Sequence, residues 1–358
     1  MNDDCLKLTT YFGERDRTDG RLLADALLDV YERRQLRTSI LMRGVGGFGL
    51  KHHLRTDQLL TLSEDLPAVS VAVDSREKID AALPEILAIK DRGLLTLERA
   101  RLLTDDIGPV ELPEHYTEAT KLTVYVGRQE RVYRAPAFDA VCALLHRRGL
   151  SGATVLLGVD GIRYGARQRA RFFGRNADVP MMIIAVGPGE QISRVLSELG
   201  GLLWNPALTL ERVRICKRDG ELIAVPHELP GTDEHGMAMW QKLMIHTSEK
   251  ARYNGKPLHR VIVEELRRSN VAGATSIRGI WGFHGDHEPH GDKLLQLYRH
   301  TPVVTIVVDI PERIAKAFEI VDALTGENGL VTSEMVPAAR AMSEQESRGG
   351  THLASHRF

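Results

Sequence analysis

The residues closest to a known chemical motif form a glycine-rich stretch near the N-terminus. Gly44, Gly46 and Gly49 fit the pattern G-x-G-x-x-G, which in dinucleotide-binding folds places a pyrophosphate at the start of a helix. Residues 50–55 begin Leu-Lys-His-His and do not read as the start of an amphipathic helix, so the helix that this chemistry needs is missing. We interpret the glycines instead as a strand end that uses the backbone freedom of glycine.

A pair of glycines three residues apart recurs twice more, each time after a strand-like run. The pairs are Gly44 and Gly47, Gly158 and Gly161, and Gly279 and Gly282. Recurrence in one setting indicates an internal repeat rather than an isolated nucleotide motif. Arg43 and Arg278 precede the first and third pair, and a guanidinium pairs well with oxyanions. We therefore expect these arginines and the six glycines to line ligand-binding sites.

The segments that follow the glycine pairs differ in chemistry. The segment after the second pair combines arginine with aromatic residues: Arg163, Arg167, Arg169, Arg171 and Arg175 with Tyr164, Phe172 and Phe173. Guanidinium groups suit phosphate or carboxylate and aromatic rings can stack on a base, so Arg163 and Arg167 are candidate ligand-binding residues. The alternative is a solvated basic loop that pairs with an acidic neighbouring surface.

The segment after the third pair is rich in histidine. His284, Asp286, His287 and His290 offer nitrogen and oxygen ligands to a divalent metal, although such loops also bind metals adventitiously. The sequence contains no G-x-S-x-G, H-E-x-x-H or P-loop motif, and its three cysteines lie far apart. We therefore expect a protein without enzymatic activity.

The strands and helices expected around these residues occur in the same order in each copy, and the first copy shows this order most clearly. Its strand-like segments are 6–12, 38–43, 69–73 and 94–103, and residues 20–34 carry apolar residues at helical spacing. A second helix is expected to begin at Asp74, with Glu77 at the spacing of a capping box. The order β-α-β-β-α-β is the split unit of ferredoxin-like folds, an α+β class.

Two further copies follow in register with the first. Lys7 recurs as Lys121 and Lys242 at the same offsets as the glycine pairs, and the sequence T-L-E-R at 96–99 returns at 209–212. The predicted organisation is three repeats at 5–103, 121–217 and 240–340, linkers at 104–120 and 218–239, and a disordered tail at 341–358.

Composition limits the class of protein. The chain is 43% hydrophobic and 27% charged with a net charge of -1, which is typical of a globular protein and disfavours a nucleic-acid binder. It contains no apolar run long enough to span a bilayer, and its acidic first residues lack a signal region. We expect a cytoplasmic protein that is not a membrane protein.

These units resemble the PII-like signal-protein family, domain of unknown function 190. The third copy carries G-K-P-L at 255–258, G-A-T at 273–275 and R-G-I-W-G-F at 278–283, and the first carries R-G-V-G-G-F at 43–48 and L-S-E-D-L-P at 62–67. The second copy diverges, with Leu157 before its glycines and Ile162 after them. The resemblance implies homotrimers of one unit with small ligands between subunits, and hence a trimer written into one chain. A sheet with helices on one face needs cover on the other, which agrees with that packing.

The resemblance also implies a signalling function. We expect a small, anionic ligand, such as a nucleotide, in clefts between repeats, and loops that act on a partner such as a transporter or an enzyme. In nucleotide-binding relatives the turn before the last strand is rich in glycine and lysine, whereas here only residues 90–93 are basic. Three equivalent nucleotide sites are therefore not expected. The alternatives are a metal-binding protein that uses the histidine-rich loop and a ligand-free scaffold.

Overall fold

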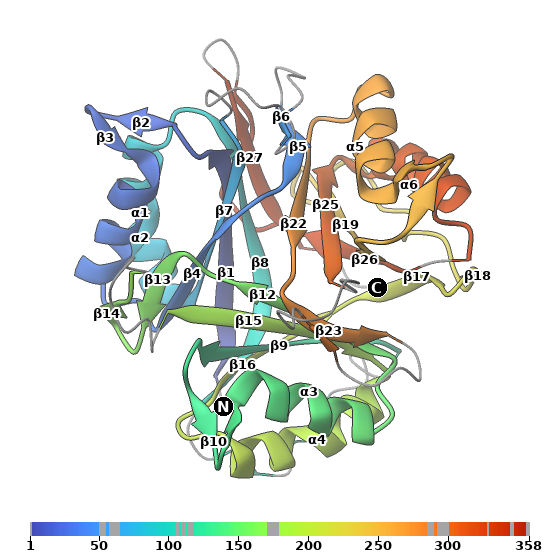
Figure 1. Ribbon diagram of the computed structural model, residues 1–358. Helices are drawn as coiled ribbons and strands as arrows, with labels where there is room; N and C mark the ends of the chain where they lie inside the picture. The colour runs from blue at the N-terminus through green and yellow to red at the C-terminus, as the bar shows by residue number, and fades with distance from the viewer. Residues whose placement is uncertain are drawn as a thin grey trace.

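The computed structural model describes residues 2–49, 55–56, 65–104, 107–108, 110, 112, 118–169, 179–284, 290–291, 301–327, 329–343 and 347–355. Over these residues the chain forms three tandem copies of one α+β unit. The helix pairs lie on the outside and the strands converge on the centre (Figure 1).

The first copy has the element order that its sequence predicts. Its main elements are β1 (Asn2–Gly13), α1 (Leu23–Arg33), β4 (Thr38–Arg43), β7 (Pro67–Ser75), α2 (Arg76–Ile89) and β8 (Gly93–Thr104). The strands are antiparallel in the order β4-β7-β1-β8. The apolar stripe of α1 packs on this sheet, and its Leu27 and Tyr31 are fully buried.

The other two copies repeat the same order. The second has β9 (Thr120–Gly127), α3 (Ala137–Arg147), β12 (Gly152–Leu157), β15 (Pro180–Gly187), α4 (Gly189–Leu202) and β16 (Ala207–Arg212). The third has β19 (Trp240–Ser248), α5 (Leu258–Arg268), β22 (Ala274–Arg278), β25 (Pro302–Asp309), α6 (Pro311–Thr325) and β26 (Leu330–Val336). A short hairpin precedes the first helix of each copy: β2 (Arg17–Thr18) with β3 (Arg21–Leu22), β10 (Arg131–Val132) with β11 (Ala135–Pro136), and β20 (Arg252–Tyr253) with β21 (Lys256–Pro257).

Each copy reaches into a neighbour through a short strand, here called the arm strand, that contains the second glycine of its pair. The arm strands are β5 (Gly46–Phe48), which pairs with β22, β13 (Asp160–Arg163), which pairs with β4, and β23 (Trp281–His284), which pairs with β12. Each continues into a second short strand, namely β6 (Arg55–Thr56), β14 (Ala166–Arg167) and β24 (His290–Gly291). These pairings connect the first copy to the third, the third to the second and the second to the first.

A second set of pairings runs around the molecule in the opposite direction. The end of β8 pairs with β16, β17 (Arg214–Arg218) pairs with β26, and β27 (Ala338–Met342) pairs with the start of β8. The last of these joins the C-terminal part of the chain to the first copy, so the three copies close into a ring.

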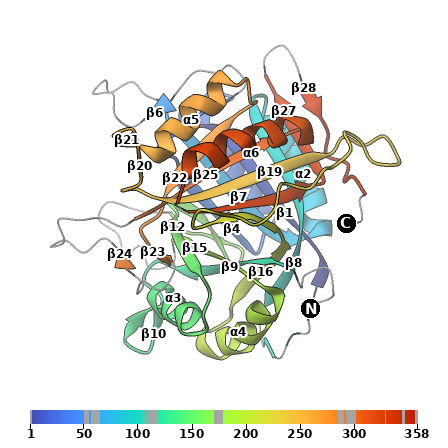
Figure 2. The ribbon, with the colours of Figure 1, turned by 90° about the vertical axis from the view of Figure 1, so that its right-hand side faces the viewer.

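The described residues form four large apolar cores and one small one around Ala119, Val186 and Val213. One lies between the sheet and the helices of each copy, and the fourth lies where the inner faces of the three sheets meet. Ile40, Leu156 and Ile277, one from each copy, are buried in this central core. A fully buried aliphatic side chain contributes about 1.5–3 kcal/mol, so the central core binds the copies together. In Figure 2 the helices α5 and α6 lie in front of the strands, and α3 and α4 lie below them.

Six charged residues form a buried ring in which lysines and glutamates from the three copies alternate. Lys7 contacts Glu98 (3.0 Å) and Glu211, Lys121 contacts Glu211 (2.9 Å) and Glu334, and Lys242 contacts Glu334 (2.9 Å) and Glu98. Every side chain in this Lys–Glu ring is at least 91% buried. Three positive and three negative charges cancel, which makes their burial tolerable.

The expected N-cap of α2 is wrong. The N-cap of α2 is Ser75, whose hydroxyl accepts a hydrogen bond from the Lys78 amide, and not Asp74. The Asp74 carboxylate instead accepts the amides of Ser75 and Arg37 and so ties the start of α2 to the start of β4.

The tail that the sequence predicts to be disordered contains ordered structure. β28 (Ser347–Gly349) pairs with β27, and Ala354 is fully buried. The Ala354 amide donates to Pro337 O, and Asp233 in the second linker accepts the amide of Ser355. The tail packs because its backbone groups find partners in the first and third copies.

Candidate ligand-binding clefts

The glycine pairs lie at the joints between copies. A Cβ atom on the second glycine of a pair would lie 2.3–2.4 Å from a carbonyl oxygen of the neighbouring strand: Gly47 from Ala274 O, Gly161 from Ser39 O, and Gly282 from Ala153 O. None of the six glycines has a left-handed φ. Glycine is therefore required by close approach of two backbones, and our expectation that it supplies backbone freedom is wrong.

The residue after the first glycine completes each joint. Its amide donates to a carbonyl of the neighbouring copy: Val45 to Ser276 (2.8 Å), Val159 to Leu41 (2.8 Å) and Ile280 to Val155 (2.9 Å). The amide of the first glycine donates within its own copy, as Gly44 does to Pro67 O (2.7 Å). The glycine-rich stretch is thus a packing joint, and its amides are already used by protein carbonyls.

The two arginines beside these joints have ion-pair partners in their own copies. Arg43 contacts Glu14 (2.6 Å) and Arg278 contacts Glu249 (3.0 Å), which occupies the same place in the third copy. Both guanidinium groups remain partly exposed. Their role in ligand binding stays a prediction.

An open cleft of about 300 Å³ lies between the first and third copies. Its inner wall is apolar and its rim is charged. The apolar lining includes Phe12, Phe48, Trp240, Ile306, Val308 and Met342, and the charged lining residues are Asp16, Arg55, Asp65 and Arg92. This volume lies at the lower end of the range for small-molecule sites.

The charges at the rim are partly paired. Arg55 contacts Asp65 (2.9 Å), and the Asp65 carboxylate also accepts the Arg15 amide (2.7 Å). Asp16 accepts the amide of Gly13 (2.8 Å). Arg92 contacts Asp91 (3.8 Å), and half of its side chain is exposed to solvent. The rim therefore presents both acidic and basic groups to a ligand.

Lys90 is a buried amine in the turn that leads to this rim. Its Nζ donates to Tyr11 O (3.1 Å) and Arg92 O (2.5 Å), and lies over the Phe12 ring. Burial lowers the pKa of Lys90 to about 7, against the opposing effect of Asp16 and Asp91. This side chain shapes the turn through its two carbonyl contacts and titrates near neutral pH.

The equivalent cleft between the second and first copies is almost filled. It encloses only about 10 Å³ and is lined by Arg37, Thr38, Tyr125, Arg163, Tyr164 and Ala207. Arg163 is buried, contacts Glu130 (2.7 Å) and lies over the Tyr164 ring. Of the predicted ligand-binding residues, Arg163 thus lies in a cleft but occupies the space itself.

Three positions explain why one cleft is open and the other closed. The strand pairing shows which residues correspond in the two clefts. Gly49 in the open cleft takes the place of Arg163 in the filled one. Ala272 and Gly273 likewise take the places of Arg37 and Thr38. Among the described residues, no atom would lie within 4 Å of a Cβ atom on Gly49. The difference between the two clefts was not predicted from the sequence. The small residues at these three positions of the aligned copies are the signal that could have shown it.

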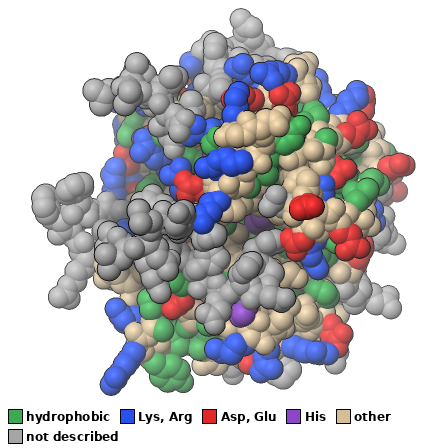
Figure 3. Space-filling view, turned by 45° about the vertical axis from the view of Figure 1, so that its right-hand side comes forward, with side chains coloured by type: hydrophobic (Ala, Val, Ile, Leu, Met, Phe, Trp, Pro, Cys, Tyr) green, Lys and Arg blue, Asp and Glu red, His purple; other side chains and the backbone are tan. Residues whose placement is uncertain are grey.

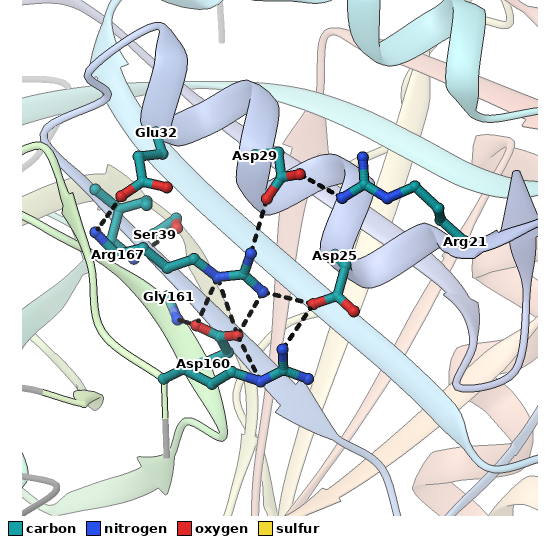
Figure 4. A network of polar contacts seen from close by, with 10 residues as sticks. Arg21, Asp25, Asp29, Glu32, Ser39, Asp160, Gly161 and Arg167 are labelled. Carbon is teal, nitrogen blue, oxygen red and sulfur yellow. Dashed lines mark hydrogen bonds and ion pairs between the residues drawn. The ribbon is translucent and has the colours of Figure 1, made fainter. Parts of the chain in front are cut away.

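Arg167 fixes the segment after the second arm strand to the first copy (Figure 4). Its guanidinium contacts Asp25 (2.6 Å) and Asp29 (2.8 Å) on α1 and Asp160 (2.8 Å) on β13. Burial would lower its pKa, but hydrogen bonds to Asp160 and Asp25 raise it above the ordinary value. The partners are carboxylates of this chain, and a role for Arg167 in ligand binding stays a prediction. Arg171 and Arg175 lie outside the described residues.

The predicted metal site cannot be assembled from the described residues. Asp286 and His287 lie outside them, and His284 and His290 are described only as backbone in β23 and β24. Among described side chains, Glu98, Glu211 and Glu334 are close enough to share an ion. Because lysine ammonium groups already neutralise these carboxylates, the donor set fits an ion-pair ring rather than a divalent cation.

The described surface shows mixed charge. On the face in Figure 3, basic and acidic side chains are interspersed among the residues that are drawn by type. Helices in the described ranges are all too short or too polar to cross a lipid bilayer.

A known protein family matches most of the chain, in three consecutive segments. The model of the DUF190 family, described as "Uncharacterized ACR", matches residues 5–102, 119–215 and 240–338. A UPF0166 protein of Aquifex aeolicus is 35% identical over 94 residues, which are 26% of this chain and 88% of that protein. A UPF0166 protein of Methanocaldococcus jannaschii is 28% identical over 91 residues, 25% of this chain and 83% of that protein. Each relative is thus about as long as one copy.

Likeness among solved structures is weak. The match to the aspartate kinase of Synechocystis covers 95% of this chain and 44% of the kinase chain. The two sequences are 10% identical there, and the TM-score is 0.27. A score of that size supports no conclusion about fold or function.

Proposed function

Because this chain belongs to the DUF190 family, with three copies of the family's unit in tandem, we propose that it is a PII-like regulatory protein. In this proposal each copy is a ferredoxin-like unit and the chain is an intrachain pseudo-trimer. A small anionic ligand binds between copies, and the loops after the arm strands act on a partner protein such as a transporter or an enzyme. The protein acts by binding and carries out no reaction of its own.

The observation that carries the proposal is the open cleft between the first and third copies. It combines a preformed volume, an apolar wall and the arginines Arg55 and Arg92 at one rim. Guanidinium groups at the mouth of an apolar cleft suit a ligand with a carboxylate or phosphate group. The filled cleft between the second and first copies leaves no comparable space, so we assign binding to the open cleft.

Arg55 and Asp65 both line the cleft, and they form an ion pair with each other (2.9 Å) although nine residues separate them in the sequence. A ligand that competes for Arg55 would weaken this ion pair and so change how Arg55 and Asp65 are held together. Differential contact of this kind is what a ligand needs in order to shift a conformational equilibrium.

Isothermal titration calorimetry tests the proposal with two glycine-to-arginine variants, one inside the cleft and one away from it. The titrants are adenine nucleotides, cyclic dinucleotides, bicarbonate and common carboxylate metabolites. We expect at least one of them to bind at one site per chain. Gly49→Arg should abolish that binding, because it introduces the side chain that fills the companion cleft.

Gly201→Arg is the matched control, since Gly201 lies on α4 with open space around it and away from the clefts. Absence of binding by every titrant would remove the ligand-sensing function. Binding that survives Gly49→Arg would place the ligand elsewhere.

A further inference from the structure

We propose that the ligand of the open cleft is amphoteric: a cationic group, ammonium or guanidinium, binds Asp16, and an anionic group binds the arginines at the rim. This inference rests on the proposed function, because it specifies the chemistry of the same cleft. It adds a cation-binding position that a purely anionic ligand would leave unused.

The companion cleft shows what occupies this position when the protein supplies the group itself. There the Arg163 guanidinium contacts the Glu130 carboxylate at 2.7 Å, and Glu130 also accepts the amide of Gly127 at 2.8 Å. Asp16 stands in the same place of the first copy. Its carboxylate accepts the Gly13 amide at 2.8 Å, and its own amide donates to Gly13 O, as the Glu130 amide does to Gly127 O.

The open cleft keeps this acid and lacks the arginine. Gly49 replaces Arg163, and no atom of the residues that the structure describes lies within 4 Å of the position of its Cβ. Asp16 lines the resulting cavity. The cavity therefore contains the carboxylate that binds a guanidinium in the companion cleft, together with the volume that the arginine side chain would fill.

The third copy offers an internal comparison. Its turn has the same backbone hydrogen bond, from the Ala251 amide to Ser248 O, but alanine stands in the place of the acid. The acid is thus not needed to form the turn. In the second copy it binds a cation, and in the first copy it faces an open cavity.

The remaining charges favour a ligand that is neutral overall. The cavity lining carries two acids, Asp16 and Asp65, and two arginines, Arg55 and Arg92. Arg55 Nη1 and Asp16 Oδ1 both lie beside Gly13, so a simple anion that gains from Arg55 would also bring its charge close to Asp16. An amphoteric ligand pairs both signs, and an unpaired charge is one means by which a site rejects a wrong ligand.

The test uses three short-chain probes that differ in which charged groups they carry: 4-guanidinobutyrate carries both, pentanoate only the carboxylate and butylguanidine only the guanidinium. We expect 4-guanidinobutyrate to bind at least 10-fold more tightly than either single-charge probe. Asp16→Asn should weaken its binding at least 10-fold while pentanoate binding stays within 2-fold. Asparagine keeps an oxygen for the Gly13 amide, so the turn is preserved.

A second measurement needs no ligand. Gly49→Arg should raise the Tm by about 2 °C more in the wild-type background than in Asp16→Asn, because the introduced guanidinium would pair with Asp16. Equal Tm shifts in the two backgrounds would overturn the cation site.

The outcomes separate the two proposals. If pentanoate binds as tightly as 4-guanidinobutyrate, or Asp16→Asn leaves binding unchanged, the amphoteric ligand is wrong and the anion-binding function stands. If no probe and no titrant of the wider panel binds, the proposed function itself fails.

Discussion

Neutralising one glutamate of the buried Lys–Glu ring should destabilise the whole molecule. Glu98 is 97% buried, contacts Lys7 at 3.0 Å and Lys242 closely, and accepts the hydroxyl of Thr96 at 3.1 Å. At 3.0 Å and an effective dielectric constant of about 20, each attraction is worth roughly 5 kcal/mol before desolvation. Glu98→Gln leaves three ammonium groups facing two carboxylates. Removing one partner of a buried pair costs about 3–5 kcal/mol, and we expect a loss of that size in the free energy of unfolding.

The same ring predicts how stability depends on pH. Burial alone would raise the pKa of Glu98, but the ammonium groups of Lys242 and Lys7 lower it well below its usual range, and Lys121 and Lys242 do the same for Glu334. A lowered carboxyl pKa gives stability that is complete above the ordinary value of about 4.3 and is lost as pH falls below it. Glu98→Gln should therefore flatten the loss of stability in acid.

Urea denaturation followed by circular dichroism measures both effects. Glu85→Gln, at a surface pair with Arg33 and Arg34, is the control and should cost less than about 1 kcal/mol. Adding Lys7→Met to Glu98→Gln restores charge balance and should recover much of the loss. A single Glu98→Gln variant within 1 kcal/mol of the wild type would refute the view that charge balance governs this ring.

Three further predictions follow from single positions. Lys90 binds a proton less tightly in the folded protein than in the unfolded chain, because burial lowers its pKa to about 7. The free energy of unfolding should therefore rise with pH between about 7 and 10, by at most about 1.4 kcal/mol per pH unit. The urea midpoints of Lys90→Met should lack that rise. Gly161→Ala places a methyl group 2.3 Å from Ser39 O and should cost about 1–3 kcal/mol by thermal unfolding, whereas Gly201→Ala, in open space on a helix, should stabilise slightly. Arg167→Gln leaves Asp25 and Asp160 with only the half-exposed Arg169 guanidinium between them and should speed amide exchange in β14, with no change expected in β6.

The element order was predictable because each helix and strand buries one face. The apolar spacing in residues 20–34 predicted the helix α1, and the strand-like segments at 38–43 and 94–103 correspond to β4 and β8. The repeat was visible for the same reason, because three copies bury the same positions. Cap assignment at Asp74 failed because two adjacent residues, Asp74 and Ser75, can both accept an amide hydrogen bond, and tertiary contact with Arg37 decides between them.

The sites were less predictable because they arise between copies. The repeated Lys7, Lys121 and Lys242 served to align the copies, yet spacing along one chain does not show that they meet glutamates of other copies. The open cleft depends on Gly49 lying opposite Gly273, two residues that local patterns treat as unrelated loop glycines. Histidine-rich residues around His287 lie outside the described part of the chain, and their metal binding remains a prediction.

Closure of the ring by β27 has a consequence for how the protein is made. β27 pairs with β8, so residues 338–342 must leave the ribosome before the edge formed by residues 93–97 is covered. Until then, a nascent chain with two finished copies presents an open strand edge, which is a template for pairing with another chain. Tethering favours the chain's own third copy, because a linked partner is present at high effective concentration. Synthesis that pauses or stops before residue 338 should therefore yield end-to-end chains of unfinished molecules.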